Sequence, residues 1–261
     1  MASRVLTSAL LGRLADIEAQ GLTRNDEPIP SGLLSVCGND YLGLRHDPAL
    51  RVGAEHAMRA YSTSASASRL VGGSSDVHLD VESQIAGWLG AEAALVFPSG
   101  YQANVALLSS LPIDGDLVVS DALNHASVID GLRLSRARRV IVPHRDVDRV
   151  REALAAPCTG QRFVVTESLF SMDGDVAPLK ALEAVCREAG AALIVDEAHA
   201  IGVRGPQGRG LAAELGVRPD VTVIACGKAM GAAGGVVCGS HEVRRWLVNR
   251  GRGFIYSTGL A

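Results

Sequence analysis

Val221-Thr-Val-Ile-Ala-Cys-Gly-Lys228-Ala-Met-Gly231 is the stretch that decides the fold of this chain. Its first five residues are mostly apolar and β-branched, which predicts a buried strand. Lys228 follows this strand and is flanked by two glycines. Because lysine is rarely buried without a partner or a chemical task, a lysine at the end of a buried strand marks a candidate site.

A second apolar run, from Ala192 to Val195, ends in Asp196-Glu-Ala-His199. An aspartate after one strand and a lysine after another are what a pyridoxal 5'-phosphate (PLP) site needs. The lysine binds the cofactor covalently as a Schiff base, and the aspartate pairs with the pyridinium nitrogen. The residues alone therefore favour a PLP enzyme with Lys228 and Asp196 at its centre.

Short apolar runs alternate with helical patterns from about residue 93 onward. We expect strands at Ala93–Phe97, Leu117–Ser120, Arg139–Val142, Phe163–Thr166, Ala192–Asp196, Val221–Ala225 and Gly235–Cys238. We expect helices at Tyr101–Ser109, His125–Leu134, Val147–Ala155, Pro178–Glu188 and Glu242–Asn249. This order predicts an α/β fold with a mostly parallel seven-stranded sheet and helices on both faces. Ligands of such sheets bind outside the carboxyl ends of the strands, where Asp196 and Lys228 fall.

Composition excludes several classes of protein. The 261 residues are 48% hydrophobic, enough for a sizeable core in one or two domains. The net charge of −3 and the lack of a long basic cluster argue against a nucleic-acid partner. No apolar run is long enough to cross a membrane, and the spacing from Val5 to Ile17 predicts an amphipathic helix rather than a signal peptide. Five cysteines without a CxxC pair indicate reduced thiols and a cytoplasmic protein.

Three further segments remain ambiguous on residues alone. The turn Pro98-Ser-Gly100 starts a helix and could bind a phosphate, although a helix start without a ligand can have the same residues. His125 at the next helix start suits stacking on a cofactor ring or simple capping. The Ser- and Ala-rich segment 60–75 is either a short linker or an ordered loop of the active site.

Three other kinds of site are excluded, because each lacks a motif or a spacing that it requires. Asp196-Glu-Ala-His199 also occurs as the Mg²⁺-binding box of helicases, but Gly227-Lys228 lacks the GxxxxGK[ST] phosphate loop. No second His or Cys stands at zinc-ligand spacing, so we expect no metal. The glycines from Gly202 to Gly210 have the wrong spacing for a dinucleotide loop.

The motifs together resemble the α-oxoamine synthases, a branch of the fold-type-I PLP enzymes, and in particular its biotin-pathway members. The matching strings run in family order from about residue 36 to 258. They are Gly38-Asn-Asp-Tyr-Leu-Gly-Leu44, Ser68-Arg-Leu-Val-Gly72, Ser99-Gly-Tyr101, Asn124-His-Ala-Ser127, Pro143-His-Arg-Asp146, Val165-Thr-Glu167, Phe170-Ser-Met-Asp-Gly-Asp175, Asp196-Glu-Ala-His199, Gly227-Lys-Ala229 and Phe254-Ile-Tyr-Ser-Thr258.

The resemblance implies a role for each matching position. Lys228 is the Schiff-base lysine and the acid/base at the substrate Cα, and Asp196 pairs with the ring nitrogen. His199 pairs with the phenolic oxygen of the ring, and His125 stacks on the ring face. The remaining cofactor contacts are Gly100, Tyr101, Ser171 and Thr258, and the substrate contacts are Asn39 and Arg24.

The resemblance also implies a reaction and partners. The reaction is the decarboxylating condensation of L-alanine with a pimeloyl thioester, carried either by CoA or by acyl carrier protein. Ser257 and Thr258 match a segment that reaches the phosphate in a partner subunit, which implies a homodimer with a shared active site. The implied domains are an N-terminal helix and arm (1–45) and a PLP-binding large domain (46–261).

Four departures from the family pattern keep two alternatives open. The chain stops at Ala261, where the family continues with a smaller C-terminal domain. Ala225 replaces a phosphate-binding threonine, and the tract 62–67 replaces glycines that are strained as Ser or Ala if they need positive φ. Arg24 is displaced by one position from the family's Leu-Arg pair. One alternative is a sibling enzyme that joins glycine or serine to another acyl-CoA. The other is a truncated, catalytically impaired homologue.

Overall fold

The structure is a computed structural model in which residues 4–30, 32–33 and 35–261 are described. It divides into two compact units, Met1–Gly38 and Asn39–Ala261. The first unit contains helix α1 (Arg4–Ala19), which confirms the helix predicted from the apolar spacing of the N-terminus. The second unit contains the sheet and the candidate site.

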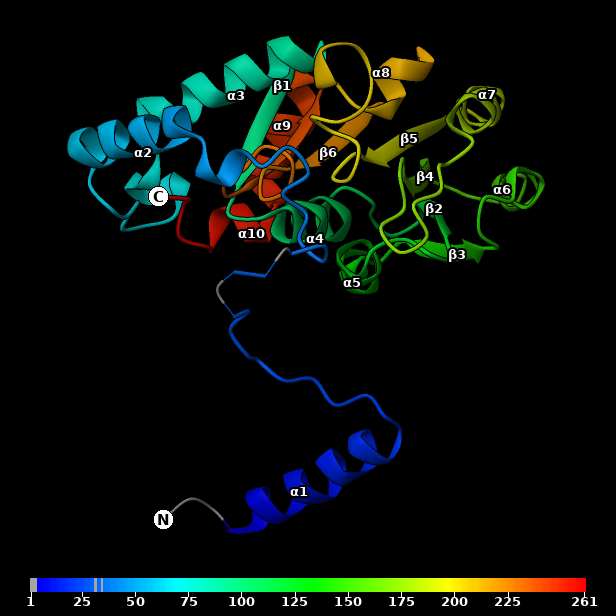
Figure 1. Cartoon of the computed structure of the whole chain (residues 1–261). Helices are drawn as coiled ribbons and strands as arrows, with labels where there is room; N and C mark the ends of the chain where they lie inside the picture. Colours follow the sequence, from blue (N-terminus) through cyan, green and yellow to red (C-terminus); the bar gives the residue numbers. More distant parts are fainter. Residues whose placement is uncertain (1–3, 31, 34) are drawn as a thin grey trace. The chain divides into compact units, whose positions relative to one another are not determined.

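One seven-stranded sheet forms the centre of the second unit (Figure 1), in the order β1-β7-β6-β5-β4-β2-β3. Its strands are β1 (Ala93–Phe97), β2 (Leu117–Asp121), β3 (Arg138–Val142), β4 (Arg162–Glu167), β5 (Ala191–Asp196), β6 (Val221–Ala225) and β7 (Gly235–Gly239). Strand β7 runs antiparallel to β1 and β6, and the other pairs are parallel. The prediction of seven strands in a mostly parallel sheet is confirmed.

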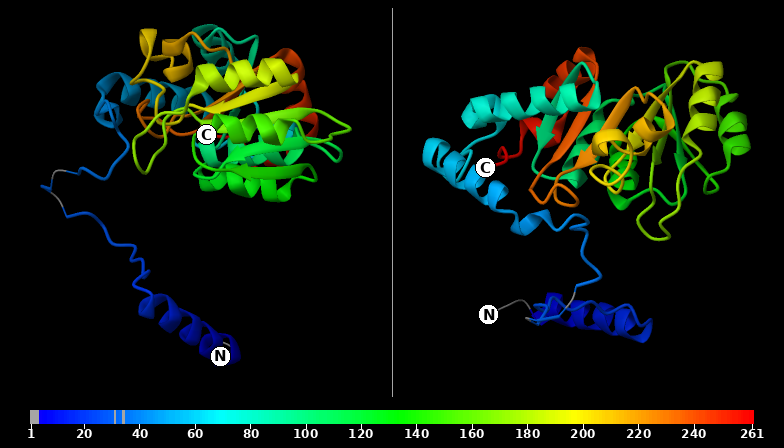
Figure 2. Two further views of the ribbon diagram at one scale, coloured as in Figure 1. Left: turned by 90° about the vertical axis from the view of Figure 1, so that its right-hand side faces the viewer. Right: turned by 45° about the horizontal axis from the view of Figure 1, so that its top comes forward.

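Helices cover both faces of this sheet (Figure 2). The helices of this unit are α2 (Pro48–Tyr61), α3 (Asp76–Leu89), α4 (Gly100–Ser110), α5 (Ala126–Leu134), α6 (Val147–Leu154), α7 (Leu179–Ala189), α8 (Leu211–Leu215), α9 (His241–Arg250) and α10 (Arg252–Ile255), of which α2 has no buried residue. Successive strand residues face opposite sides, so Leu117 and Val119 pack with α6 and α7, while Val118 packs with α4 and α5. Burial on both faces explains why the strands other than the edge strand β3 have mostly apolar sequences.

The Ser- and Ala-rich tract before Arg69 contains two strained positions. Ser62 has φ 70° and Ser66 has φ 61°. The left-handed region is costly for a residue with a Cβ atom and is normally occupied by glycine. The tract therefore does contain positions that need positive φ, as the sequence comparison with a glycine-rich pattern suggested.

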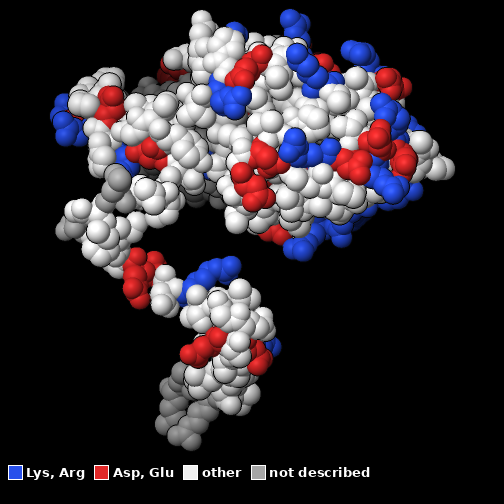
Figure 3. All heavy atoms as spheres, turned by 45° about the vertical axis from the view of Figure 1, so that its right-hand side comes forward, with Lys and Arg blue, Asp and Glu red and all other residues white. Residues whose placement is uncertain are grey.

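Charged side chains of both signs are mixed on the face shown in Figure 3. On α6, Arg149 pairs with Glu152 at 2.6 Å and Arg151 pairs with Asp148 at 3.0 Å. None of the helices in the described part of the chain is long and apolar enough to cross a membrane. Within the same residues, no group of three or more His, Cys, Asp or Glu side chains could hold a metal ion.

Candidate active site

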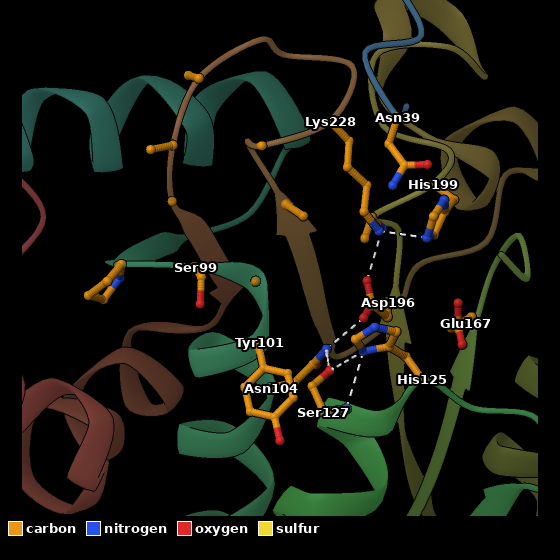
Figure 4. Close-up of a pocket in the computed structure, with 18 residues that line it drawn as sticks. Asn39, Ser99, Tyr101, Asn104, His125, Ser127, Glu167, Asp196, His199 and Lys228 are labelled. Atoms are coloured by element: carbon orange, nitrogen blue, oxygen red, sulfur yellow. Dashed lines mark hydrogen bonds between the residues drawn. The ribbon is translucent and has the colours of Figure 1, made fainter. Parts of the chain in front are cut away.

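A cavity of about 450 Å³ lies at the carboxyl ends of β4, β5 and β6 and beside the first turns of α4 and α5. Figure 4 shows the side chains that border it. Seven of the residues predicted for the site line the cavity: Asn39, Gly100, Tyr101, His125, Asp196, His199 and Lys228. The parallel strands bring these residues together because their carboxyl ends share one edge of the sheet.

Asp196 is the last residue of β5 and is only 6% exposed. Its Oδ2 accepts a hydrogen bond from Asn104 Nδ2 at 2.6 Å, and its Oδ1 accepts one from the backbone N–H of Ala198 at 2.9 Å. Hydrogen bonds to a carboxylate favour its charged form and fix its direction. Asp196 is therefore an oriented buried carboxylate at the floor of the cavity.

His125 is tied to the same network through Ser127. Asn104 Nδ2 donates to Ser127 Oγ at 3.0 Å, and Ser127 Oγ lies 2.7 Å from His125 Nδ1. The backbone N–H of Ser127 also donates to His125 Nδ1, at 3.2 Å. Because Nδ1 accepts, the proton of the neutral ring belongs on Nε2. The imidazole is held in one orientation at the start of α5, which a ring needs in order to stack on another ring.

Lys228 begins a second chain of hydrogen bonds on the opposite wall. Its Nζ lies 2.6 Å from His199 Nε2, and His199 Nδ1 lies 2.7 Å from the hydroxyl of Tyr41. The Tyr41 hydroxyl donates to Asn39 Oδ1 at 3.1 Å. A consistent direction follows, in which the ammonium donates to His199, whose other nitrogen donates to Tyr41. A proton on Lys228 is thus connected to the mouth of the cavity.

Burial changes the proton affinities of both groups in this chain. It lowers the pKa of Lys228, although the charges of Asp196 and Glu167 oppose the change. Burial, reinforced by the charge of Lys228, lowers the pKa of His199 to about 4. His199 is consequently neutral near pH 7 and able to accept from Lys228, and the lysine gives up its proton more readily than a lysine in water.

The other end of the cavity is built from backbone. Ser99 caps α4 by accepting from the N–H of Gln102, and the two N–H groups before Gln102, at the start of the helix, have no partner within it. A Cβ added at Gly100 would lie 2.9 Å from Ala225 Cβ, and one added at Gly235 would lie 2.4 Å from Gly100. Only glycines permit this close approach, which leaves a cradle for an anion at the helix start.

These residues fit PLP at both of its ends. The helix start suits a phosphate group, Asp196 suits a protonated ring nitrogen, and Lys228 supplies the amine that binds the aldehyde. Ala225 is buried, lines the cavity and presents only a methyl group to this region. The anion cradle therefore lacks a side-chain donor at this position.

Three predicted residues lie outside the lining of the cavity. Ser171 is exposed in the turn after β4, and Thr258 is exposed and pairs with Ser68 in an isolated bridge. Arg24 belongs to the unit Met1–Gly38, whereas the residues that line the cavity belong to the unit Asn39–Ala261. Their assignments as cofactor and substrate contacts stay predictions.

Four side chains of the site received no role from the sequence: Tyr41, Asn104, Ser127 and Glu167. Three of them stand inside the strings quoted above, next to residues that were given roles. Asn104 lies four residues after Gly100, one helical turn further on, and this spacing could have placed it on the same face of α4. Nothing in the sequence alone indicates that its amide joins two catalytic side chains.

Comparison with known proteins identifies the family. The aminotransferase class I and II family matches residues 31–261. The chain is 50% identical over 260 residues to 8-amino-7-oxononanoate synthase of Mycolicibacterium smegmatis, covering 96% of this chain and 68% of the relative. It is 45% identical over 250 residues to a putative 8-amino-7-oxononanoate synthase of Bacillus licheniformis, covering 95% of this chain and 66% of the relative.

Solved structures agree with this match. A serine palmitoyltransferase variant from S. paucimobilis with bound PLP superimposes with a TM-score of 0.88 at 29% identity, covering 97% of this chain and 69% of that one. An 8-amino-7-oxononanoate synthase from Francisella tularensis gives a TM-score of 0.76 at 28% identity, covering 88% and 65%. The predicted fold type, enzyme class and cofactor are confirmed. The chain belongs to the aminotransferase class I and II family and is one of its PLP-dependent transferases.

Proposed function

We propose that this chain catalyses the decarboxylating condensation of L-alanine with a pimeloyl thioester, which yields 8-amino-7-oxononanoate for biotin synthesis. The observation that carries the proposal is the meeting of Lys228, Asp196 and His199 at one cavity. This cavity belongs to a chain that is half identical to a relative named for that product.

Each side chain has a task in this reaction. PLP, when bound, supplies an electron sink for the carbon next to the amino group of the substrate. Asp196 keeps a proton on the ring nitrogen, because a buried, hydrogen-bonded carboxylate stabilises the opposite charge beside it. The Lys228 amine takes the Cα proton of alanine and later returns one to the product carbon, which its lowered pKa favours.

His199 and Tyr41 support this proton transfer from the second wall. His199 accepts from Lys228 and so points the amine toward Asp196, as Figure 4 shows. Tyr41 holds the other nitrogen of His199 and is 44% exposed at the mouth of the cavity. Asn39 offers its amide beside Tyr41, where it can bind the substrate carboxylate.

A sibling reaction is the second candidate. Serine palmitoyltransferase structures superimpose on 97% of this chain, so serine with a longer acyl-CoA is a reasonable competitor for alanine with a pimeloyl thioester. The cavity residues that act on Cα do not distinguish the two amino acids. Ala225, which offers no side-chain donor to the cavity, favours weaker cofactor binding, which an impaired homologue would also show.

The assembly and location belong to the same proposal. Thr258 is exposed and lies outside the cavity of its own chain, which suits a segment that completes the site of a second subunit. We expect a homodimer with a shared active site, located in the cytoplasm. Sedimentation of the purified protein with and without PLP measures the first of these expectations.

The test is a condensation assay with the chain, PLP and matched substrate pairs. L-alanine is combined with pimeloyl-CoA and with pimeloyl-acyl carrier protein, and L-serine is combined with palmitoyl-CoA. Mass spectrometry follows the amino-ketone product, and Lys228→Ala is the blank. We expect 8-amino-7-oxononanoate from a pimeloyl pair. Product from serine and palmitoyl-CoA alone would overturn the assignment in favour of the sibling reaction.

A further inference from the structure

Glu167 has a polar atom that the structure leaves unused. It is the last residue of β4, is 2% exposed and lines the cavity. Its Oε1 is buried and has no hydrogen-bond partner among the described residues. Buried polar atoms are almost always paired, so an unpaired oxygen at the wall of a ligand cavity indicates a contact with the ligand.

Other buried glutamates in this chain are paired. Glu82 accepts from Arg69 at 2.9 Å and from Arg244 at 3.0 Å. Glu197 accepts from Ser168 at 2.6 Å and from two backbone N–H groups at the start of α8. Both side chains hold the fold together, and neither lines this cavity. Glu167 differs from them because its free oxygen contributes nothing to folding.

A second carboxyl group stands beside Glu167. The register of β4 and β5 places Glu167 opposite Asp196, and Figure 4 shows both carboxyl groups on the cavity side of the sheet. Asn104 and the backbone N–H of Ala198 already donate hydrogen bonds to the two oxygens of Asp196. Two like charges side by side in a buried site repel each other, so one of the two groups keeps its proton. Asp196 accepts hydrogen bonds at both of its oxygens, whereas Oε1 of Glu167 accepts none, so Glu167 is the group that keeps the proton.

The charges around Glu167 agree with this assignment. Burial and the negative charge of Asp196 raise the pKa of Glu167 to about 7, and Asp121 acts in the same direction. The backbone N–H of His125 and the charge of Lys228 oppose the increase. His199, on the other wall, is neutral near pH 7 because its pKa is lowered to about 4.

We propose that Glu167 is a further residue of the cofactor site that acts as a neutral acid, donating a hydrogen bond from its carboxyl group to an acceptor oxygen of the bound molecule. The inference deepens the proposed function, since it rests on the same site. The acceptor belongs either to PLP or to the amino-acid carboxylate, both of which offer oxygen lone pairs.

Glu167 contacts the loop that carries His125 through its backbone and through its side chain. Its backbone N–H donates to Asn124 Oδ1 at 3.0 Å, and its carboxyl accepts from the backbone N–H of His125. Asn124 also donates to the carbonyl of Val165 at 2.8 Å, within the same strand. Glutamine keeps an acceptor for His125 and leaves the bonds of Asn124 in place, whereas alanine removes that acceptor. The unfolding temperatures of both variants are therefore measured, which separates loss of ligand binding from loss of structure.

The experiment measures the dissociation constant of PLP for the wild type, Glu167→Gln and Glu167→Ala at pH 6, 7 and 8. The same titrations are repeated with L-alanine present. Glutamine is neutral and keeps a hydrogen-bond donor. We therefore expect the PLP dissociation constant of Glu167→Gln to stay within about threefold of the wild-type value at pH 6 and not to change up to pH 8. Alanine removes the donor and should weaken binding about tenfold, the equivalent of one hydrogen bond.

An infrared spectrum supplies a readout that does not depend on catalysis. The wild type should show the carbonyl band of a protonated carboxylic acid near pH 6, fading through about pH 7, and Glu167→Gln should lack it. Glu82→Gln is the matched control, because it changes a buried glutamate that does not line the cavity. We expect Glu82→Gln to lower the unfolding temperature and to leave the dissociation constant of PLP unchanged.

Two results would overturn the proposal. If Glu167→Gln weakens binding as much as Glu167→Ala, the site needs a charged carboxylate rather than a neutral acid. If Glu167→Ala binds PLP and alanine as the wild type does, Glu167 does not contact either molecule. An effect that appears only with alanine assigns the acceptor to the amino acid and supports the proposal. None of these titrations uses an acyl thioester, so failure of the condensation assay leaves the inference standing.

Discussion

The two ends of the cavity are built from different kinds of chemical group. At the sheet end, the side chains of Asp196, Asn104, Ser127 and His125 form one connected network. At the α4 end, the cradle consists of backbone and glycines, and Ala225 adds no polar atom. The sheet end depends on residue identity, whereas the α4 end depends on backbone conformation. Substitutions at the sheet end should therefore have larger effects.

We expect the largest effect, a loss of PLP retention, from the removal of Lys228. Lys228→Ala loses the only amine among the cavity-lining residues, so covalent attachment of PLP should fall to the background level. Absorbance in the near-ultraviolet and visible range after gel filtration measures the retained cofactor. Lys180→Arg, on the exposed side of α7, is the control and should retain PLP fully. Covalent retention in Lys228→Ala would remove this residue from the centre of the site.

The pH dependence of stability should report the buried His199. Its pKa is about 4 in the folded chain against 6.5 in the unfolded chain, so the unfolded state binds more protons between these values. The free energy of unfolding should therefore decrease as the pH falls from 6.5 to 4, by up to about 3 kcal/mol. Urea titrations at several pH values measure this slope.

His199→Gln is the matched variant for the pH experiment, since glutamine does not titrate in this range. Its free energy of unfolding should change less between pH 6.5 and 4 than that of the wild type. Equal slopes for the two proteins would show that another group controls acid stability, and that His199 is not held neutral.

Asn104 tests the connection between Asp196 and His125. Asn104→Ala removes the amide that donates to both Asp196 and Ser127, at 2.6 and 3.0 Å. We expect the dissociation constant of PLP to rise about tenfold, because a charge-assisted hydrogen bond is lost inside the site. Asn104→Asp should be worse than alanine, since it adds a negative charge beside Asp196. Wild-type affinity in both variants would show that the network does not orient the cofactor-binding groups.

The smallest expected effect is a gain in PLP affinity from a substitution at the α4 end of the cavity. Ala225→Thr adds a hydroxyl group next to the cradle at Gly100 and should tighten PLP binding about fivefold. Ala225→Val has the same shape without the hydroxyl and serves as the control. A gain in both variants would assign the effect to packing, and a gain in neither would show that the backbone alone saturates the phosphate.

The contrast between side-chain and backbone construction also explains what the sequence could predict. Six of the seven strands follow from apolar runs, because strands buried on both faces leave a continuous signal, while the edge strand β3 is mostly exposed and follows from its last three residues. Lys228, Asp196, His199 and His125 converge because each follows a strand at the same edge of the sheet. The sequence could place these side chains without knowing their contacts.

The remaining features depend on tertiary contacts. The amide of Asn104 meets Asp196 across 92 residues, and the hydroxyl of Tyr41 meets His199 across 158 residues. The unpaired oxygen of Glu167 is defined by what is missing around it, which no local pattern records. Ser62 and Ser66 adopt positive φ because the backbone around them requires it, against the preference of serine.

One measurement tests the central claim, that Lys228 and Asp196 form a working PLP site. The purified chain is mixed with PLP, reduced with borohydride, digested and mapped by mass spectrometry. The chain has two lysines, Lys180 and Lys228, so the peptide that carries the label is unambiguous. The account predicts stoichiometric label on Lys228, reduced in Asp196→Asn. Label on Lys180, or equal label on both, would contradict it.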